Sequence, residues 1–219
     1  MEVTARLKLG VLISGRGSNL QALLDAAADP AFPAEVALVL SNKSDAYGLE
    51  RAAKAGVPSA VVRHKDFPDK PAFEQAMTEA LEAAGVELVC LAGFMRLLSP
   101  WFVERWHDRL INIHPSLLPS FPGLDTHRRA LETGVRFHGC TVHYVRTIMD
   151  QGPILVQAAV PVLPGDTEDG LAARVLEQEH RAYPMAVRLI AEGRVRVVDE
   201  RAEVVGDAAV PAPVLNPAA

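Results

Sequence analysis

The stretch that decides the fold is residues 7–24, which read LKLGVLISGRGSNLQALL. Its first half is apolar and of strand length, the two glycines that follow predict a tight turn, and the leucines after them repeat at helical spacing. A strand that turns directly into an amphipathic helix is typical of a mostly parallel sheet with helices on both faces. The sequence therefore predicts an α/β fold.

The same alternation continues along the chain. Strand patterns occur at 7–14, 35–41, 60–63, 86–92 and 110–114, and Gly56 and Gly85 stand where a helix ends before a strand. After a proline-rich loop at 115–122, residues 137–145 and 153–160 predict a hairpin. A long helix begins near Thr167, and Pro184 predicts a kink or break in it. We expect a three-layer, Rossmann-like fold: a mostly parallel twisted sheet with helices on both faces and an antiparallel C-terminal addition.

Composition excludes several classes of protein. The 219 residues are 49% hydrophobic and 22% charged, which is enough apolar material for a full core. The 22 basic and 27 acidic residues leave a net charge of −5, which disfavours bulk nucleic-acid binding. No uncharged stretch reaches the length of a membrane span and no signal-peptide pattern is present, so we expect a cytoplasmic protein. Cys90 and Cys140 lie in apolar runs and are expected to be buried thiols.

The glycine loop at 13–20, ISGRGSNL, is the first candidate site. Glycines let the backbone approach an anion, and the N–H groups and partial positive charge of a helix N-terminus favour one. The loop lacks the lysine of a Walker A motif, and Leu20 replaces the third glycine of a dinucleotide motif, so it predicts a phosphomonoester site. A tight turn with a Ser or Asn helix cap explains the same residues.

A polar pair at the end of the strand 110–114 is the second candidate. Asn112 and His114 project from the same strand face because they are two residues apart, and Pro115 restricts the backbone of His114. An amide donor beside an imidazole suits acyl transfer, which needs oxyanion stabilisation and proton movement. A structural hydrogen-bonded pair at the strand end is the alternative.

Two acidic residues complete the candidates that the pattern itself provides. Asp150 follows the strand 137–145 by a short loop and would orient the ring of His114 if the two are close, although Asp in this context also forms turns. Glu179 lies in the middle of an apolar helix face, where it needs either a ligand or an internal partner. The remaining histidines lack the spacing of a zinc site, and we expect no metal.

Longer motifs at these positions point to a known family. They are SGRGSNLQA at 14–22, SNK at 41–43, LAGFMRLLSP at 91–100, NIHPSLLP at 112–119, HGCTVH at 138–143, DQGP at 150–153 and QEH at 178–180. Together they resemble the phosphoribosylglycinamide formyltransferases (glycinamide ribonucleotide transformylases) of the 10-formyltetrahydrofolate-dependent formyltransferase superfamily, over about residues 8–198. The resemblance implies transfer of a formyl group from 10-formyltetrahydrofolate to the amine of glycinamide ribonucleotide in purine biosynthesis.

The resemblance also implies a role for each matching residue. Asn112, His114 and Asp150 match the catalytic residues of the family, and Glu179 would meet the ribose hydroxyls of glycinamide ribonucleotide. The phosphate of that substrate would bind the loop formed by Gly15, Arg16, Gly17, Ser18, Asn19, Leu20 and Gln21. The folate would contact Lys70, Met95, Arg96, Leu97, Leu98, Asn112, Arg146, Thr147, Ile148, Met149 and Asp150.

Some positions depart from the family pattern. Lys70 stands where relatives often carry Arg, so a point charge replaces a bidentate fork. Ser120 and Asp125 replace basic or imidazole groups in the loop after His114. We expect one formyltransferase domain at 1–200, with a phosphate-binding N-terminal half and a C-terminal half that completes the folate cleft and catalytic site. An extension at 201–219 is expected to be flexible at its end.

The same resemblance implies the binding partners and the alternative functions to be considered. The expected partners are the two small-molecule substrates, with neither nucleic acid nor membrane, and the oligomeric state is either monomer or homodimer. The main alternative is a formyltetrahydrofolate hydrolase (deformylase), which normally carries an extra N-terminal regulatory domain. A transferase that acts on initiator tRNA normally adds a C-terminal domain. We expect neither, because the first strand begins near Lys8 and only a short tail follows residue 200.

Overall fold

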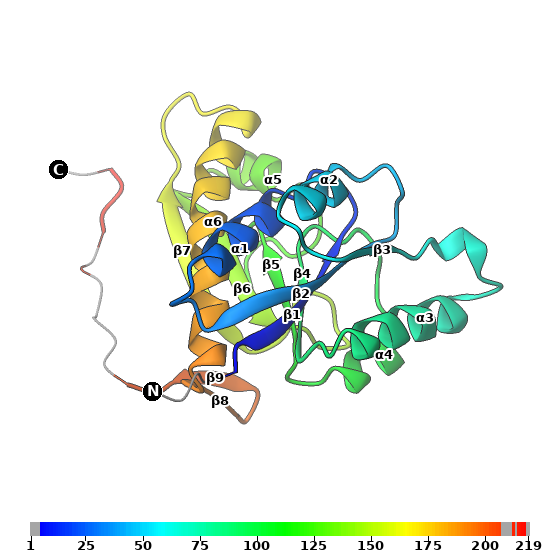
Figure 1. The fold of residues 1–219 in the computed structure, drawn as a ribbon. Coiled ribbons are helices and arrows are strands. Elements are labelled where there is room, and N and C mark those ends of the chain that lie inside the picture. Colours follow the sequence, from blue (N-terminus) through cyan, green and yellow to red (C-terminus); the bar gives the residue numbers. More distant parts are fainter. Residues whose placement is uncertain (1–4, 207–211, 213, 218–219) are drawn as a thin grey trace. The chain divides into compact units, whose positions relative to one another are not determined.

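The computed structural model describes residues 5–206, 212 and 214–217. They form two compact units, of which the first holds the residues up to Asn112 together with Tyr144–Thr147. The second holds Ile113–His143 and the residues from Ile148 onward. Seven strands form one sheet in the order β3-β2-β1-β4-β5-β6-β7, and two form a separate sheet, β8-β9 (Figure 1). The predicted α/β fold class, mostly parallel with an antiparallel C-terminal addition, is confirmed.

The element bounds follow the predicted strands closely. The strands are β1 (Leu7–Ile13), β2 (Ala34–Ser41), β3 (Ser59–Val61), β4 (Leu88–Leu91), β5 (Leu110–His114), β6 (Phe137–Tyr144), β7 (Ile154–Pro161), β8 (Val195–Val198) and β9 (Arg201–Val204). The helices are α1 (Ser18–Ala28), α2 (Tyr47–Lys54), α3 (Lys70–Ala83), α4 (Pro100–Arg105), α5 (Thr126–Thr133) and α6 (Glu168–Ala191), and a short 3₁₀ helix, η1, covers His64–Asp66.

The first unit is a parallel βα arrangement. β1 pairs in parallel with β2 and β4, and β2 pairs with β3. In Figure 1, α1 and α2 lie on one side of these strands and α3 and α4 on the other. Phe73, Met77 and Leu81 of α3 belong to one buried cluster with Leu12 of β1 and Leu40 of β2. Burial of this apolar surface fixes the strands, and with them the loop at the carboxyl end of β1.

Helix ends in this unit fall where glycine permits a left-handed backbone. Gly56 follows α2 and Gly85 follows α3, and both have φ of 68°. Glycine adopts this conformation without the steric cost that a Cβ atom would bring. The predicted helix ends before β3 and β4 are therefore confirmed.

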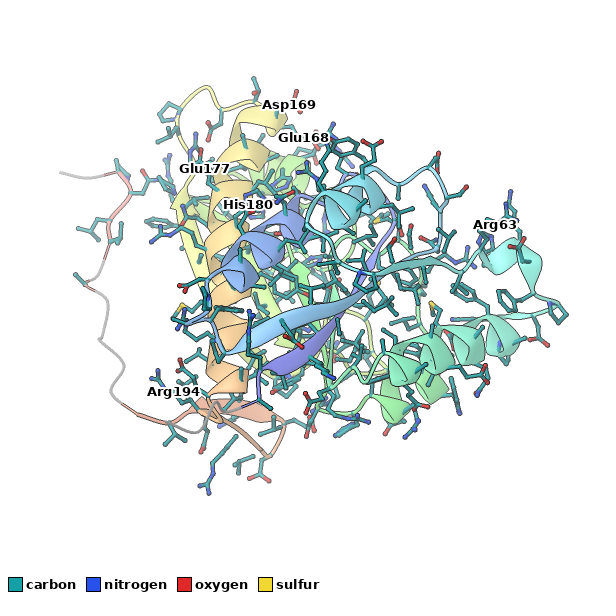
Figure 2. The ribbon with its side chains drawn as sticks, viewed as in Figure 1. Arg63, Glu168, Asp169, Glu177, His180 and Arg194 are labelled. Atoms are coloured by element: carbon teal, nitrogen blue, oxygen red, sulfur yellow. The ribbon has the colours of Figure 1, made fainter. Side chains whose placement is uncertain are left out.

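The second unit combines the β6–β7 pair with α5 and α6. β6 and β7 are antiparallel, as predicted, with Phe137 opposite Pro161. α6 packs on β7 and on α5. Thr167 caps α6 by accepting a hydrogen bond from the Gly170 N–H (3.1 Å). Glu168 and Asp169 occupy its first turn (Figure 2), where negative charge complements the helix dipole.

The predicted break at Pro184 is wrong. α6 continues from Glu168 to Ala191 with Pro184 inside it. A proline removes one helical N–H donor, but Tyr183 and Val187 on either side are fully buried and hold both halves of the helix in place. Tertiary packing therefore outweighs the local cost of the proline.

Part of the C-terminal extension is also ordered against the second unit. The Asn216 side chain donates hydrogen bonds to the carbonyl oxygens of Arg136 (2.5 Å) and Val162 (3.0 Å). The flexibility predicted for the end of the chain concerns mainly residues 207–211, 213 and 218–219, which lie outside the described residues. Within the described part of the chain, no helix has both the length and the apolar character needed to cross a bilayer. Cys90 and Cys140 are buried free thiols, as predicted.

Candidate active site

His114 and Asp150 come together in the second unit. His114 ends β5, and Asp150 lies in the connection between β6 and β7. The Nδ1 atom of His114 lies 3.5 Å from Oδ1 of Asp150, and 9% of each side chain is exposed. This distance is that of an ion pair, somewhat longer than a hydrogen bond, and low exposure limits screening by water. The structure therefore places the carboxylate where it can orient the imidazole.

The other ring nitrogen of His114 also faces an oxygen atom. Its Nε2 atom lies 3.1 Å from the carbonyl oxygen of Phe121, which is hydrogen-bond distance. The structure therefore places one oxygen atom beside each ring nitrogen of His114.

The loop after β5 is tied to the same carboxylate. Oδ2 of Asp150 accepts a hydrogen bond from the Gly123 N–H (2.7 Å). The Thr141 hydroxyl donates to the Ser116 carbonyl (2.7 Å) and accepts from the Leu118 N–H (3.0 Å). Asp150 thus contacts both the loop and the His114 ring, so the two are positioned together. Phe121 and Gly123 carried no signal in the sequence that linked them to the site.

Asn112 adds an amide to the same strand. It precedes His114 by two residues in β5, so the two side chains project from one face of the strand. Asn112 is half-buried and His114 is buried. The strand Leu110–His114 thus has the bounds and the two-residue spacing that the sequence predicted.

Two further histidines lie beside the loop. His138 is 1% exposed and packs edge-on against the rings of Phe121 (5.8 Å between centroids) and His127 (5.2 Å). Burial, and then the charge of neighbouring His127, lower the pKa of His138 to about 4. Burial also lowers the pKa of His127. Protonation of His138 is therefore unfavourable in the folded state.

We expect His138 to make the fold sensitive to acid. Its pKa is about 4 in the folded state against the ordinary 6.5, so the unfolded chain binds more protons between these values. The stabilisation is complete above pH 6.5 and is lost as pH falls toward 4, which amounts to about 2 kcal/mol between pH 7 and pH 5. Urea unfolding of His138→Phe should show a smaller pH dependence than wild type over this range.

The exposed His107 provides the control for this measurement. Its side chain is 44% exposed, so His107→Gln should retain the wild-type pH dependence of unfolding. Equal pH dependence in wild type and His138→Phe would contradict the prediction.

The glycine loop after β1 leads directly into α1. Gly17 is the N-cap residue, with φ of 69° and ψ of 34°. Within the described chain, no side chain caps α1 and no acidic residue occupies its first turn. The Ser or Asn cap that could have explained the loop is therefore not the reason for its sequence. The first N–H groups of α1 lie at the positive end of the helix dipole, where an anion is favoured.

Gly17 and Gly15 should respond differently to an added methyl group. At Gly17, φ is positive and a Cβ atom would lie 2.8 Å from the Cα atom of Gly48, whereas at Gly15 it would meet nothing within 4 Å. The left-handed backbone alone costs an alanine roughly 1–3 kcal/mol. Gly17→Ala should lower the free energy of unfolding by at least that amount in urea titrations, and Gly15→Ala by less than about 0.5 kcal/mol. Equal losses in the two variants would show that the loop does not require a glycine at Gly17.

The segment from Met95 to Leu98 is fixed to the end of β1. The Met95 N–H donates to the Ser14 hydroxyl (2.8 Å), which in turn donates to the Asn42 side-chain oxygen (2.6 Å). The side chains of Met95 and Leu97 are 65% and 71% exposed. Large exposed apolar side chains on a well-anchored segment are typical of a binding surface.

The other residues that the family resemblance assigns to folate binding have mixed surroundings. Nζ of Lys70 lies 3.8 Å from Oε1 of Glu74, a buried carboxylate that also accepts from the Ser99 N–H (2.8 Å). Glu74 thus holds both Lys70 and the N-terminus of α4, a role that the helical pattern around it did not reveal. Nη2 of Arg146 lies 2.7 Å from Oδ1 of Asp108. Ile148 and Met149 are 61% and 55% exposed.

Glu179 occupies the buried face of α6, as its position in the apolar stripe predicted. It is 7% exposed and shares this face with Val175 and Ala182. Burial, and then the Glu179 carboxylate, raise the pKa of the Cys140 thiol to about 12. Cys140 is therefore an unreactive thiol, and Glu179 is a buried carboxylate on this face.

Comparison with known proteins now identifies the family. The pattern of the Formyl transferase family matches residues 7–187. The chain belongs to the formyl transferase family. The phosphoribosylglycinamide formyltransferase of Escherichia coli (strain K12) is 46% identical over 196 residues, which cover 90% of this chain and 92% of that protein. The crystal structure of glycinamide ribonucleotide transformylase 1 from Symbiobacterium toebii is 51% identical, with a TM-score of 0.89 over 92% of this chain and 95% of that one.

Other members of the formyl transferase family are much longer. The trifunctional purine biosynthetic protein adenosine-3 of Drosophila pseudoobscura pseudoobscura is 56% identical over 197 residues, but the match spans only 14% of its length. The chain thus spans between 14% and 19% of the trifunctional proteins that it matches. A formyltetrahydrofolate deformylase from Pseudomonas putida KT2440 shares the fold at 31% identity, with a TM-score of 0.83 over 91% of this chain and 70% of that one.

Proposed function

We propose that this formyl transferase transfers the formyl group of 10-formyltetrahydrofolate to the amine of glycinamide ribonucleotide, as a step of purine biosynthesis. Supporting evidence is the high identity to phosphoribosylglycinamide formyltransferases over nearly the full length of both chains. The observation that carries the chemistry is the pairing of His114 with Asp150, at 3.5 Å, on a strand that also bears Asn112. These are the groups that acyl transfer to an amine requires.

The mechanism follows from these groups. The lone pair of the neutral amine attacks the formyl carbon, the C=O bond becomes a single bond, and the oxygen acquires a negative charge. Asn112 and a protonated His114 donate hydrogen bonds to that oxygen. For this, the Nε2–H of His114 exchanges the Phe121 carbonyl oxygen for the substrate oxygen, while Nδ1 stays beside Asp150. Return of the electron pair re-forms the C=O bond and breaks the bond to the folate nitrogen, which takes a proton while the attacking nitrogen loses one. The products are formylglycinamide ribonucleotide and tetrahydrofolate.

Asp150 has two tasks in this mechanism. Its negative charge pairs with the protonated His114 ring and keeps it oriented toward the formyl oxygen. Through water, the carboxylate also helps to carry the proton from the attacking nitrogen to the departing one. The two substrates, held side by side, then react as one unit, which supplies much of the rate acceleration.

We assign the binding residues by the same reasoning. The phosphate of glycinamide ribonucleotide binds the N–H groups of the loop from Gly15 to Gln21, and Glu179 binds the ribose hydroxyls. Lys70, the segment from Met95 to Leu98 and the segment from Arg146 to Asp150 bind the folate. Residues 1–200 make up the proposed catalytic domain. Its proposed partners are the two small-molecule substrates, with neither nucleic acid nor membrane, and the cytoplasm is the proposed location. No step of the reaction requires a metal ion.

One experiment distinguishes the proposed transferase activity from the deformylase alternative. The protein is mixed with 10-formyltetrahydrofolate, with and without glycinamide ribonucleotide, and tetrahydrofolate release is followed. We expect release only when the amine substrate is present, with one formylated product formed for each tetrahydrofolate. Release at the same rate without the amine would identify a hydrolase instead.

A further inference from the structure

The first turn of α2 lies directly against the glycine loop. A Cβ atom on Gly17 would lie 2.8 Å from the Cα atom of Gly48, and one on Gly48 would lie 2.4 Å from Cδ1 of Ile13. The backbones of the loop and of α2 are therefore in contact, with no space for a side chain between them. The Gly48 N–H also donates a hydrogen bond to the carbonyl oxygen of Gly15 (3.0 Å).

Arg51, one turn further along α2, holds the next peptide group of the loop. Its Nε atom donates to the carbonyl oxygen of Arg16 (2.9 Å), and its Nη1 atom donates to Oε1 of Gln21 (3.0 Å). Its guanidinium lies 4.9 Å from the ring centroid of Tyr47, a cation–π distance. The side chain is therefore fixed by the loop, by α1 and by its own helix.

These contacts determine where the loop N–H groups point. In a planar trans peptide, the C=O of one residue and the N–H of the next point in opposite directions. Because Gly48 binds the carbonyl of Gly15, the N–H of Arg16 points away from α2. Because Arg51 binds the carbonyl of Arg16, the N–H of Gly17 also points away from α2. Both donors are then free to face an anion at the N-terminus of α1.

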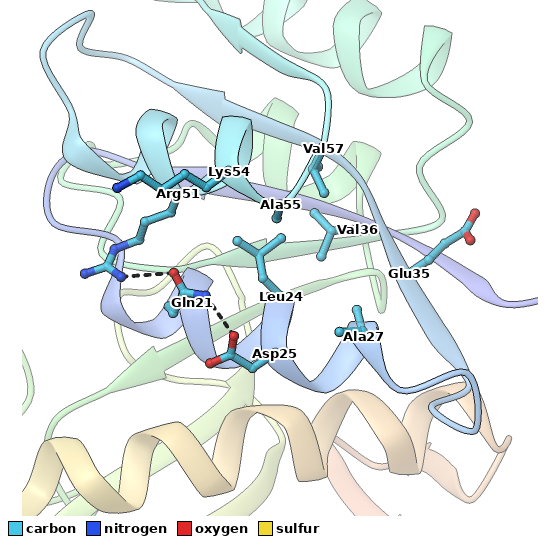
Figure 3. Close-up of a pocket in the computed structure, with 11 residues that line it drawn as sticks. Gln21, Leu24, Asp25, Ala27, Glu35, Val36, Arg51, Lys54, Ala55 and Val57 are labelled. Atoms are coloured by element: carbon cyan, nitrogen blue, oxygen red, sulfur yellow. Dashed lines mark hydrogen bonds between the residues drawn. The ribbon is translucent and has the colours of Figure 1, made fainter.

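Arg51 makes these hydrogen bonds at the edge of a cavity and not within the buried core. Arg51 and Gln21 line a cavity of about 480 Å³ between α1 and α2, with Leu24 and Val36 on its wall (Figure 3). The same view shows the hydrogen bond from Arg51 to Gln21, and Gln21 continues it to Asp25 (2.8 Å). A shorter side chain at Arg51 would therefore enlarge an existing cavity and leave the buried cluster of the unit intact.

We propose that Gly48 and Arg51 of α2 are positioning residues for phosphate binding, because they orient the Arg16 and Gly17 N–H groups of the glycine loop. This inference rests on the proposed function, in which the loop binds the phosphate of glycinamide ribonucleotide. Neither residue contacts the phosphate itself. Their effect should therefore appear in the affinity for the phosphate-bearing substrate and not in the chemical step.

Steady-state kinetics of Arg51→Met test this role. With saturating 10-formyltetrahydrofolate, KM for glycinamide ribonucleotide should rise about tenfold, the loss expected when hydrogen bonds that orient donors to a charged group are removed. The kcat value and KM for the folate should change less than threefold. Arg51→Lys keeps the charge but cannot make both hydrogen bonds, so it should resemble Arg51→Met.

Lys54→Met is the matched control. Lys54 lies on the same helix, its Nζ atom is 5.6 Å from the same Tyr47 ring centroid, and it lines the same cavity. Within the described residues, Lys54 makes no hydrogen bond to the glycine loop. Its replacement should therefore leave kcat and the KM values for both substrates near wild type. A KM increase in Lys54→Met equal to that in Arg51→Met would overturn the proposal, because general charge would then explain both.

Titration with inorganic phosphate separates this inference from the proposed function. In ¹⁵N-labelled wild type, the Arg16 and Gly17 amide resonances should shift on addition of phosphate, and in Arg51→Met they should shift only at about tenfold higher concentration. If the wild-type resonances do not move, the phosphate assignment in the proposed function is wrong. If they move equally in both proteins, the loop binds phosphate but Arg51 does not position it. Gly48→Ala should repeat the Arg51→Met result, and thermal unfolding identifies any variant that has lost its fold.

Discussion

Replacement of His114 by Ala should lower kcat by about a thousandfold while KM for either substrate changes little. Removal of one donor to an oxyanion typically lowers kcat 10²–10³-fold, and the protonated imidazole adds a positive charge to that hydrogen bond. Both ring nitrogens of His114 already face oxygen atoms, at 3.1 Å and 3.5 Å, so the ring is held by its surroundings before any substrate binds. A pre-positioned donor acts mainly in the transition state, which is why kcat and not KM should change.

Stopped-flow and steady-state measurements of tetrahydrofolate formation check this prediction. Added imidazole should restore part of the activity of His114→Ala, since the substitution leaves space for a free ring. His107→Ala, which removes an exposed histidine, should keep wild-type kcat. A kcat of His114→Ala within tenfold of wild type would exclude His114 from the chemical step.

Asp150→Asn should lower kcat by roughly a hundredfold. The substitution is nearly isosteric, and the amide oxygen can still accept the hydrogen bond that Oδ2 takes from the Gly123 N–H (2.7 Å). What is lost is the negative charge 3.5 Å from the His114 ring. The ring then lacks its ionic partner, and the proton path between the two substrate nitrogens lacks its carboxylate. The effect should therefore exceed that of a simple loop perturbation.

Asp166, a second carboxylate of the same unit, provides the control for Asp150→Asn. It distinguishes a specific loss of kcat at Asp150 from a general effect of removing a paired charge. Asp166 pairs with Arg174 (2.8 Å), and the hydrogen bond from Arg174 lowers the pKa of Asp166 to about 2. Asp166→Asn also removes a paired charge but lies outside the proposed machinery, so kcat should stay near wild type. Comparable losses of kcat in Asp166→Asn and Asp150→Asn would indicate a general effect of charge or stability.

Local patterns predicted much of the fold. β5 was predicted with its observed bounds because an apolar run ends at Pro115, which cannot continue the ladder. The long helix was predicted, but the alternative of a break at Pro184 was wrong, because local propensity does not include the burial of Tyr183 and Val187. The glycine loop before α1 and the His114–Asp150 pair were predicted from glycine content, strand periodicity and motif resemblance.

Residues that act through long-range contacts could not be found in this way. Arg51 touches Arg16 across 35 positions of sequence, and Gly123 touches Asp150 across 27. Such contacts depend on how separate elements pack, and neither residue stands in a pattern that distinguishes it from a surface arginine or a loop glycine. In the sequence, Glu74 cannot be distinguished from other acidic residues of an amphipathic helix. Only the structure shows that its carboxylate accepts a hydrogen bond from the Ser99 N–H.

One feature of β5 affects how firmly the reactive groups are aligned. The division between the two compact units falls within this strand, immediately after Asn112, so the amide belongs to one unit and the imidazole to the other. Two residues of extended chain span about 6.7 Å, and covalent bonds fix that length. The separation of the two Cα atoms along the strand is therefore set by the backbone, whatever side chains pack around it.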